Sequence, residues 1–540
     1  MSTDTRALVA AESSTMELVS GGLVALSLLL VASGLVGLFG LVPPTATVGG
    51  LPFATLQGAG LALLGLGVVG VGGASRTGLV GSQPSRSAGL LAGGAFALVG
   101  LVVGGLAGAF ALGLSTLWPL AALLVGAATG AVTVLPREDL GSTVVPGLTA
   151  VVVGLVVLTG VVGPGWSWPI GDLSATLHGD VAIPLVTAVA GLLAAWTAAK
   201  AYAGFGSRGR QLGAYLLVGA NATWMVALLV GLVAFVTIRG FAPMTRGIRY
   251  GLFVQPWTWF YFPPIEEYVI IHAPVVWFYW PFAMEGVALT NEINGVLPAI
   301  VGTFWLVAGA VTFAVPLGVG AAVFLTEYAE QGRFTGLVEV STNGLWSTPS
   351  IVYGLFGLAF LVPRLGNTTS ILTGQLVLGF MLLPLVVITS RETLKSVPDS
   401  YRDASAALGV SKWETIKSVV LPAALPGVIT GVILGVGRIA GETAPILLVM
   451  VSDPFPSQAA QVVRGSFHFT GSFPFVAVPT VDLVQSSSAL PYQLYAIISA
   501  GVGQRPDFAW ATALVLLLVV LSFYAVGIAS RVYFRRKLNQ

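Results

Sequence analysis

Cysteine is absent from this 540-residue sequence, which excludes disulfides, thiolate catalysis and cysteine metal sites. Charge is scarce too, because only 9% of the residues are charged, against roughly 25% in a soluble globular protein. The three histidines lie far apart in sequence without ligand spacing, and the net charge of +2 is too small to indicate nucleic-acid binding. The G-x-x-x-x-G-K-[ST] loop that holds ATP is also missing. We therefore expect no catalytic residue, no metal and no cofactor bound by this chain.

Apolar residues are abundant instead: they make up 56% of the chain, which also contains 69 glycines. A transmembrane helix needs about 20 predominantly apolar residues, and small residues let such helices pack closely. The long uninterrupted runs favour helices over a barrel, whose strands would alternate with period two. The sequence thus predicts an all-α polytopic membrane protein of about twelve spans, near residues 18–42, 51–73, 88–113, 116–135, 144–163, 181–203, 212–238, 295–326, 343–363, 371–390, 423–451 and 508–530.

Lysines and arginines in short loops predict the orientation of these spans. If the N-terminus is cytoplasmic, most of these residues fall inside, including the C-terminal group from Arg531 to Lys537. We therefore expect a multi-pass protein of the cell membrane with both termini cytoplasmic. The polar first residues do not resemble a cleaved signal peptide, which begins with a basic stretch and a short apolar core.

The chain divides by character into two expected regions. Residues 1–210 form about six spans with very short loops and almost no polar side chains. Residues 211–540 have long connections, at about 239–294 and 452–507, and one strongly charged loop at 391–422. We expect the function to reside in the second region. The first could stabilise an assembly, bind a regulator or widen the lipid-facing surface.

The charged loop predicts two short helices joined at a glycine. Asp399 to Leu408 forms the first, and Gly409 is suited to the left-handed position that ends a helix. Ser411 followed by Glu414 has the spacing of a capping box for the second helix, which we expect Pro422 to end. On charge alone, this segment could be a solvated connector or a rigid knob that docks on a partner.

The order of residues resembles the EAA loop of type I ABC importer permeases (the MetI-like family). That motif has Glu-Ala-Ala, three further residues, Gly and later Ile-x-Leu-Pro. The corresponding positions here are Asp403, Ala404, Ser405, Gly409, Val419, Leu421 and Pro422. Asp for Glu, Ser for Ala and Val for Ile are mild departures. The resemblance implies that this knob docks on an ATPase subunit and transmits its closure.

The apolar run after the loop carries two further patterns. Gly427, Gly431 and Gly435 recur every four residues and predict a close-packing helix face. Arg438 and Glu442 also lie four apart and share a helix face within an apolar span. An ionisable residue at such depth indicates function by default. The pair could simply neutralise itself, or Arg438 could offer its planar fork of donors to an oxyanion, oriented by Glu442.

The string RIAGETAPILL, which ends in Thr443, Ala444 and Pro445, resembles the PstA family of phosphate permeases. Three stretches agree with that resemblance, at 297–329, 347–360 and from 490 onward. It implies a pathway at Arg438, Glu442 and Thr443, and a chain that uses ATP only through a partner. The implied partners are a PstC-like sister permease, a PstB-like ATPase dimer, a PstS-like phosphate-binding protein and membrane lipid.

Two other readings of function stay open. An ABC permease for sulfate, molybdate or another oxyanion would have the same coupling loop. An ion-coupled secondary transporter would commonly show inverted repeats with broken helices in both halves, and none is evident here.

Two local features also have two interpretations each. The aromatic segment 255–282 could be an interfacial belt or a dock for a binding protein, and the hydroxyls of 347–350 could line the pathway or satisfy backbone groups beside Pro349.

Overall fold

The computed structural model describes residues 15–111, 113–114, 116–169, 176–262, 267–287, 295–330, 332–464, 480–500 and 506–538. The chain separates into two compact units, Met1–Leu232 and Val233–Gln540. Their boundary lies inside the long helix α7 (Gly206–Thr245). The sequence placed a boundary near residue 210 instead, and the assignment of residues 1–210 as a region with its own role remains a prediction.

The N-terminal unit is built from antiparallel helix pairs: α1 (Thr15–Leu38) packs on α6 (Gly179–Tyr202), α2 (Phe53–Thr77) on α5 (Glu138–Leu158), and α3 (Leu90–Leu106) on α4 (Trp118–Val134). Glycines permit these close approaches, since a Cβ on Gly65 would clash with the carbonyl of Gly147. A π-turn, η1 (Ala107–Ala111), follows α3. Two small hairpins, β1 (Thr47–Val48) with β2 (Leu51–Pro52) and β3 (Ser167–Pro169) with β4 (Thr176–His178), connect the helices.

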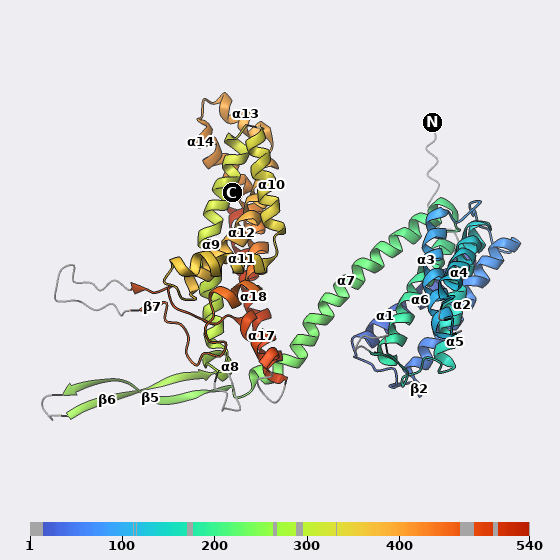
Figure 1. The fold of residues 1–540 in the computed structure, drawn as a ribbon, viewed down its shortest axis with the longest axis horizontal. Coiled ribbons are helices and arrows are strands. Elements are labelled where there is room, and N and C mark those ends of the chain that lie inside the picture. The colour runs from blue at the N-terminus through green and yellow to red at the C-terminus, as the bar shows by residue number, and fades with distance from the viewer. Residues whose placement is uncertain are drawn as a thin grey trace, which may run out of the picture. The chain divides into compact units, whose positions relative to one another are not determined.

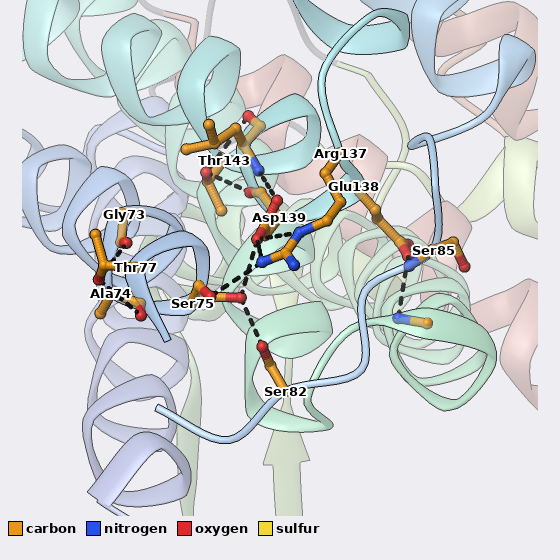
Figure 2. Close-up of polar contacts among 12 residues, drawn as sticks. Gly73, Ala74, Ser75, Thr77, Ser82, Ser85, Arg137, Glu138, Asp139 and Thr143 are labelled. Carbon is orange, nitrogen blue, oxygen red and sulfur yellow. Dashed lines mark hydrogen bonds and ion pairs between the residues drawn. The ribbon is translucent and has the colours of Figure 1, made fainter. Parts of the chain in front are cut away.

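One end of this unit is held by polar contacts (Figure 2). Arg137 pairs with Asp139, which also accepts a hydrogen bond from the hydroxyl of Ser75 at 3.2 Å. The carboxylate of Glu138 accepts from the backbone N–H of Ser85 at 2.9 Å. Asp139 and Glu138 are fully buried, so their partners are required to offset the cost of removing the charges from water. These contacts tie the loop after α2 to the start of α5.

The C-terminal unit is arranged around helix α12 (Ile371–Lys395), which packs against α9 (Leu297–Val323) and α15 (Leu421–Ala440). Helix α18 (Asp507–Leu538) packs on α15, and α17 (Leu490–Ala500) on α9 and α18. The core between them is wholly apolar at its centre, where Leu306, Leu378 and Ile439 are buried together. The remaining elements are α8 (Pro281–Met284), α10 (Arg333–Ser347), α11 (Ser350–Phe356), α13 (Asp399–Ala407), α14 (Lys412–Thr415), α16 (Ala444–Val449), the π-turns η3 (Phe324–Tyr328), η4 (Gly357–Leu361) and η6 (Ile416–Val420), and the 3₁₀ turn η5 (Val362–Arg364).

The aromatic segment folds as a two-stranded antiparallel hairpin of β5 (Arg249–Phe262) and β6 (Glu267–Tyr279). The register shifts between Pro256 and Thr258, as expected where proline cannot donate to the ladder. Within its unit this hairpin lies at the end opposite to α13 and α14 (Figure 1). Belt and binding-protein dock both remain predictions for it. A short hairpin of β7 (Val463–Arg464) and β8 (Thr480–Val481) completes the strands of the described residues.

The predicted all-α membrane fold is confirmed: among the described residues, ten helices are long and apolar enough to cross a membrane, or eleven with one bent pair. Two expected spans need correction. The run at 343–363 is not straight, because α10 and the helix from Ser350 meet at a bend of 100° around Pro349. The run at 423–451 breaks after Ala440 and resumes as α16. Helix α4 is apolar but, at 17 residues, is shorter than the ten helices counted as membrane-spanning.

Candidate functional site

The charged loop forms a projecting knob at one end of the C-terminal unit (Figure 1). Helix α13 begins at Asp399 after Pro398, and Gly409 follows it with φ of +73°, in the left-handed region that favours glycine. The backbone N–H of Gly409 donates to the carbonyl of Ala406, which closes the helix end. Asp403 and Ala404 are exposed on α13, and Ser405 is buried on its inner side.

The second helix of the knob differs from its prediction in two ways. Ser411 caps α14 through the N–H of Glu414, but the carboxylate of Glu414 accepts from Ser418 at 2.7 Å rather than completing the capping box. Pro422 was expected to end this helix, but the helix continues through it. The π-turn η6 shifts the hydrogen-bond register, so that Leu421 donates to Ile416, and Pro422 occupies the first turn of α15, where its missing N–H is tolerated. Leu421 and Pro422 thus lie in the helix that leaves the knob.

Arg402 fastens the knob to the membrane helices. Its Nη2 donates to Oε1 of Glu327 at 2.7 Å and its Nε donates to Oε2 at 3.3 Å. Its remaining hydrogens reach the carbonyls of Val397 and Leu394 and the carboxylate of Asp399. The hydrogen bond to Glu327 raises the pKa of the Arg402 guanidinium, which keeps this anchor charged at any physiological pH. The bidentate pair fixes the orientation of α13 against η3, which follows α9.

Two apolar side chains of the knob are exposed in the part of the chain that the structure describes. Leu408 is 82% exposed and Trp413 is 59% exposed. Beside Trp413, an apolar groove of about 330 Å³ runs between η3 and the start of α15, with Val323, Phe324 and Leu421 in its wall. Exposed apolar surface on a charged knob is typical of a protein–protein contact.

The three glycines spaced four apart lie against α12. A Cβ on Gly427 would clash with Thr393, one on Gly431 with Thr389, and one on Gly435 with Leu382. The missing side chains therefore allow α15 to approach α12 closely. This contact runs from the knob toward Arg438.

Arg438 lies in the last turn of α15, and its Nε is 3.7 Å from Oε1 of Glu442. Glu442 follows the end of the helix, which stops at Ala440, so the expected shared helix face is corrected to a contact across a helix terminus. The guanidinium also stacks on Trp346, with Cζ 4.2 Å from the ring centroid. Its side chain is 39% exposed, so the group is accessible. Thr443 is close in sequence and precedes α16.

Two hydroxyls at the α10–α11 bend donate to the backbone. Ser347 and Thr348 both donate to the carbonyl of Gly344 at 2.9 Å. They satisfy backbone groups at a broken helix, which was one of the two expected roles.

Two site residues escaped the sequence reasoning. Glu327 has the sequence position of an ordinary residue at the end of an apolar run, but it holds Arg402 across 75 positions of sequence. Trp346 had no assigned role, but it covers Arg438. Single-residue patterns contain no signal for either contact, since both depend on how distant helices pack.

The fold and these sites define a class, the multi-pass inner-membrane permease. Comparison with known proteins makes this specific. Residues 314–540 match the model of the "Binding-protein-dependent transport system inner membrane component". The "Phosphate transport system permease protein PstA" of Haemophilus influenzae is 32% identical over 247 residues, covering 46% of this chain and 78% of that protein. The PstA of Yersinia pestis is 31% identical over 45% of this chain and 74% of that protein, and PstA 1 of Mycobacterium tuberculosis H37Rv is 37% identical over 31% of this chain and 54% of that protein.

Among solved structures, the MetNI methionine ABC transporter in inward-facing conformations aligns with 16% identity and a TM-score of 0.33, covering 44% of this chain and 94% of that one. The assignment rests on the sequence relatives. The chain belongs to the binding-protein-dependent family of ABC importer permeases, and within it to the PstA-like permeases. It is a transport permease subunit of the plasma membrane and carries a further membrane unit before the matched region.

Proposed function

We propose that this chain is the PstA-like permease subunit of an ATP-driven phosphate importer. It would form the translocation path with a PstC-like sister permease, receive phosphate from a PstS-like binding protein and be driven by a PstB-like ATPase dimer. ATP would be bound and hydrolysed by that partner. Under this proposal the transport function resides after about residue 210, and both termini are cytoplasmic.

The observation that carries the proposal is the continuous helix from the knob to Arg438. The knob presents exposed Leu408 and Trp413, as a surface seated on a partner requires. From Lys412 the chain stays helical to Ala440, a length of roughly 40 Å at 1.5 Å per residue. A displacement of the knob by an ATPase would therefore be delivered along one rod to the cationic group at its far end.

Arg438 is the group that we assign to the phosphate. Its fork of donors suits the oxygens of phosphate, and its two present contacts are weak ones. The distance to Glu442 is beyond hydrogen-bond range, and the stacked Trp346 offers no acceptor. An arriving oxyanion can therefore compete for the donors of Arg438. Glu442 would then keep the arginine oriented and limit how tightly the anion is held, which import requires if the anion is to be released.

Labelled-phosphate uptake into vesicles tests the proposal. The vesicles contain this chain with its ATPase, sister permease and binding protein, and sulfate and molybdate serve as competitors. ATP-dependent uptake that phosphate or arsenate alone competes away is the expected result. Competition by sulfate or molybdate would mean an ABC permease for another oxyanion. Uptake driven by an ion gradient without the ATPase would refute the coupling assignment.

A further inference from the structure

The N-terminal unit contains one buried carboxylate that faces two cations. Oε1 of Glu138 is 3.0 Å from Nζ of Lys200, and Oε2 is 3.3 Å from Nη1 of Arg210. Glu138 and Lys200 are essentially inaccessible, at 0% and 1% exposure. Oε2 also accepts from the backbone N–H groups of Ser85 and Gly206. Oε2 therefore has three donors and Oε1 has the ion pair to Lys200. With one carboxylate and two cations, this cluster retains one positive charge in excess.

The excess charge is available at Arg210 rather than at Lys200. Lys200 is enclosed by the hydroxyl of Ser142 at 2.6 Å and by the ring of Trp196. Arg210 is 47% exposed and uses Nη1 for Ser85 and Glu138. Its Nε and Nη2 have no hydrogen-bond partner within the described part of the chain. Two donors of a planar fork are thus left for an anion.

Two cavities meet at Arg210. One is an apolar groove of about 380 Å³ between α3, α6 and α7, with Ala92, Ala95, Phe96 and Trp196 along it and Lys200 and Arg210 at its polar end. The other is a wider polar cavity of about 1110 Å³, whose wall includes Ser82, Ser85 and Arg208. Figure 2 shows Ser85 beside Glu138 at this polar end. At this end of the unit, Arg210 therefore lies between the apolar groove and the polar cavity.

We propose that this site binds one anionic phospholipid. The lipid phosphate lies on Nε and Nη2 of Arg210 with Arg208 nearby, the headgroup occupies the polar cavity, and one acyl chain lies in the groove along Ala95 and Phe96. Basic pockets between membrane helices are recognised features of lipid headgroup binding. An anion at Arg210 would offset the excess charge of the Glu138 cluster. The acyl chain would cover the apolar side chains that line the groove.

The groove distinguishes a lipid from a free anion. Inorganic phosphate could satisfy Arg210 but would leave the apolar slot unfilled. A zwitterionic lipid could fill the slot but brings no net charge to match the cluster. The site thus requires both parts of the ligand, and each part can be removed separately by substitution.

Native mass spectrometry of the full-length chain tests this, after equilibration with phosphatidylglycerol, phosphatidylcholine or inorganic phosphate. We expect one retained phosphatidylglycerol and no comparable retention of phosphatidylcholine. Arg210→Gln should weaken retention about fivefold, which corresponds to about 1 kcal/mol. Ala95→Trp should weaken it similarly by filling the slot, without touching the ion cluster.

Matched controls separate these effects from folding. Leu98→Trp places the same ring on α3, where Leu98 is 65% exposed and lies outside the groove. Arg76→Gln removes an exposed arginine that lines neither cavity. Both should retain the lipid like the unmodified chain, and thermal unfolding should be unchanged for Ala95→Trp. Equal retention of phosphatidylcholine, no effect of Ala95→Trp, or complete displacement of the lipid by inorganic phosphate would each overturn the proposal.

Discussion

The bidentate pair between Arg402 and Glu327 makes the sharpest prediction for the knob. Glu327→Gln preserves the shape of the side chain but removes its charge. The pair lies mostly out of water, with side-chain exposures of 23% and 6%. Charged hydrogen bonds in such settings contribute about 1.5–3 kcal/mol each, and we take about 2 kcal/mol as the loss because a glutamine can still accept one bond.

That loss has a definite consequence for the knob. About 2 kcal/mol raises the population of a detached α13 by roughly 30-fold. Amide hydrogen exchange over residues 399–408 should accelerate by a similar factor. Under the proposed coupling role, ATP-driven uptake should fall with it, because a detached α13 would not transmit the closure of the ATPase. The amount of inserted chain should stay the same.

Asp399→Asn is the matched control, because Asp399 accepts from the same arginine at 3.2 Å but is 91% exposed. Exposed ion pairs contribute about 0–1 kcal/mol, so exchange and uptake should change little. Equal effects of the two substitutions, or normal uptake with Glu327→Gln, would show that the buried pair does not hold the knob in its working position.

Four further outcomes are expected. Gly409→Ala should lower uptake by straining a left-handed residue at a cost of about 1–2 kcal/mol, and Gly409→Asn, which tolerates that region, should restore much of it in the same uptake assay. Gly431→Leu should reduce the folded yield in size-exclusion chromatography because its side chain would collide with Thr389 of α12, whereas Ala423→Leu on an exposed position of the same helix should not. Arg438→Gln should reduce phosphate uptake while leaving co-purification with the ATPase intact. Trp346→Leu should raise the apparent affinity for phosphate, because the anion no longer competes with a stack of about 0.5–2 kcal/mol.

Local chemistry allowed much of the knob to be predicted. Asp399, Gly409 and Ser411 each specify their own conformation through a helix start, a left-handed residue and a cap, and such signals are readable within a few positions. Pro422 misled the same reasoning, because its effect depends on the π-turn before it. A proline signals a helix end only when the register continues unchanged.

Contacts between distant segments could not be predicted from the sequence. The pairing of Glu327 with Arg402 and the stacking of Trp346 on Arg438 each require a bend or a crossing set by the whole bundle. The aromatic segment is a related case: its density of aromatic residues suited a membrane surface, but aromatic residues also favour strands. The hairpin of β5 and β6 is consistent with that shared preference.

The geometry around Arg438 bears on how import could be made directional. The arginine is the end point of the helix that leaves the knob, and Trp346 belongs to α10, which ends at the 100° bend. Helix α10 also holds Glu339, which pairs at 3.0 Å with Arg391 near the end of α12 that leads into the knob. The segments bearing the arginine and the tryptophan are therefore both connected to the knob, by different routes.

If a displacement of the knob moves these two segments by unequal amounts, the stack on Arg438 opens or closes with the ATPase cycle. The guanidinium is then accessible to the anion in one state and covered by Trp346 in the other. Trp346→Leu would then reduce the dependence of anion binding on nucleotide. An effect of equal size in both nucleotide states would show that Trp346 has no part in that dependence.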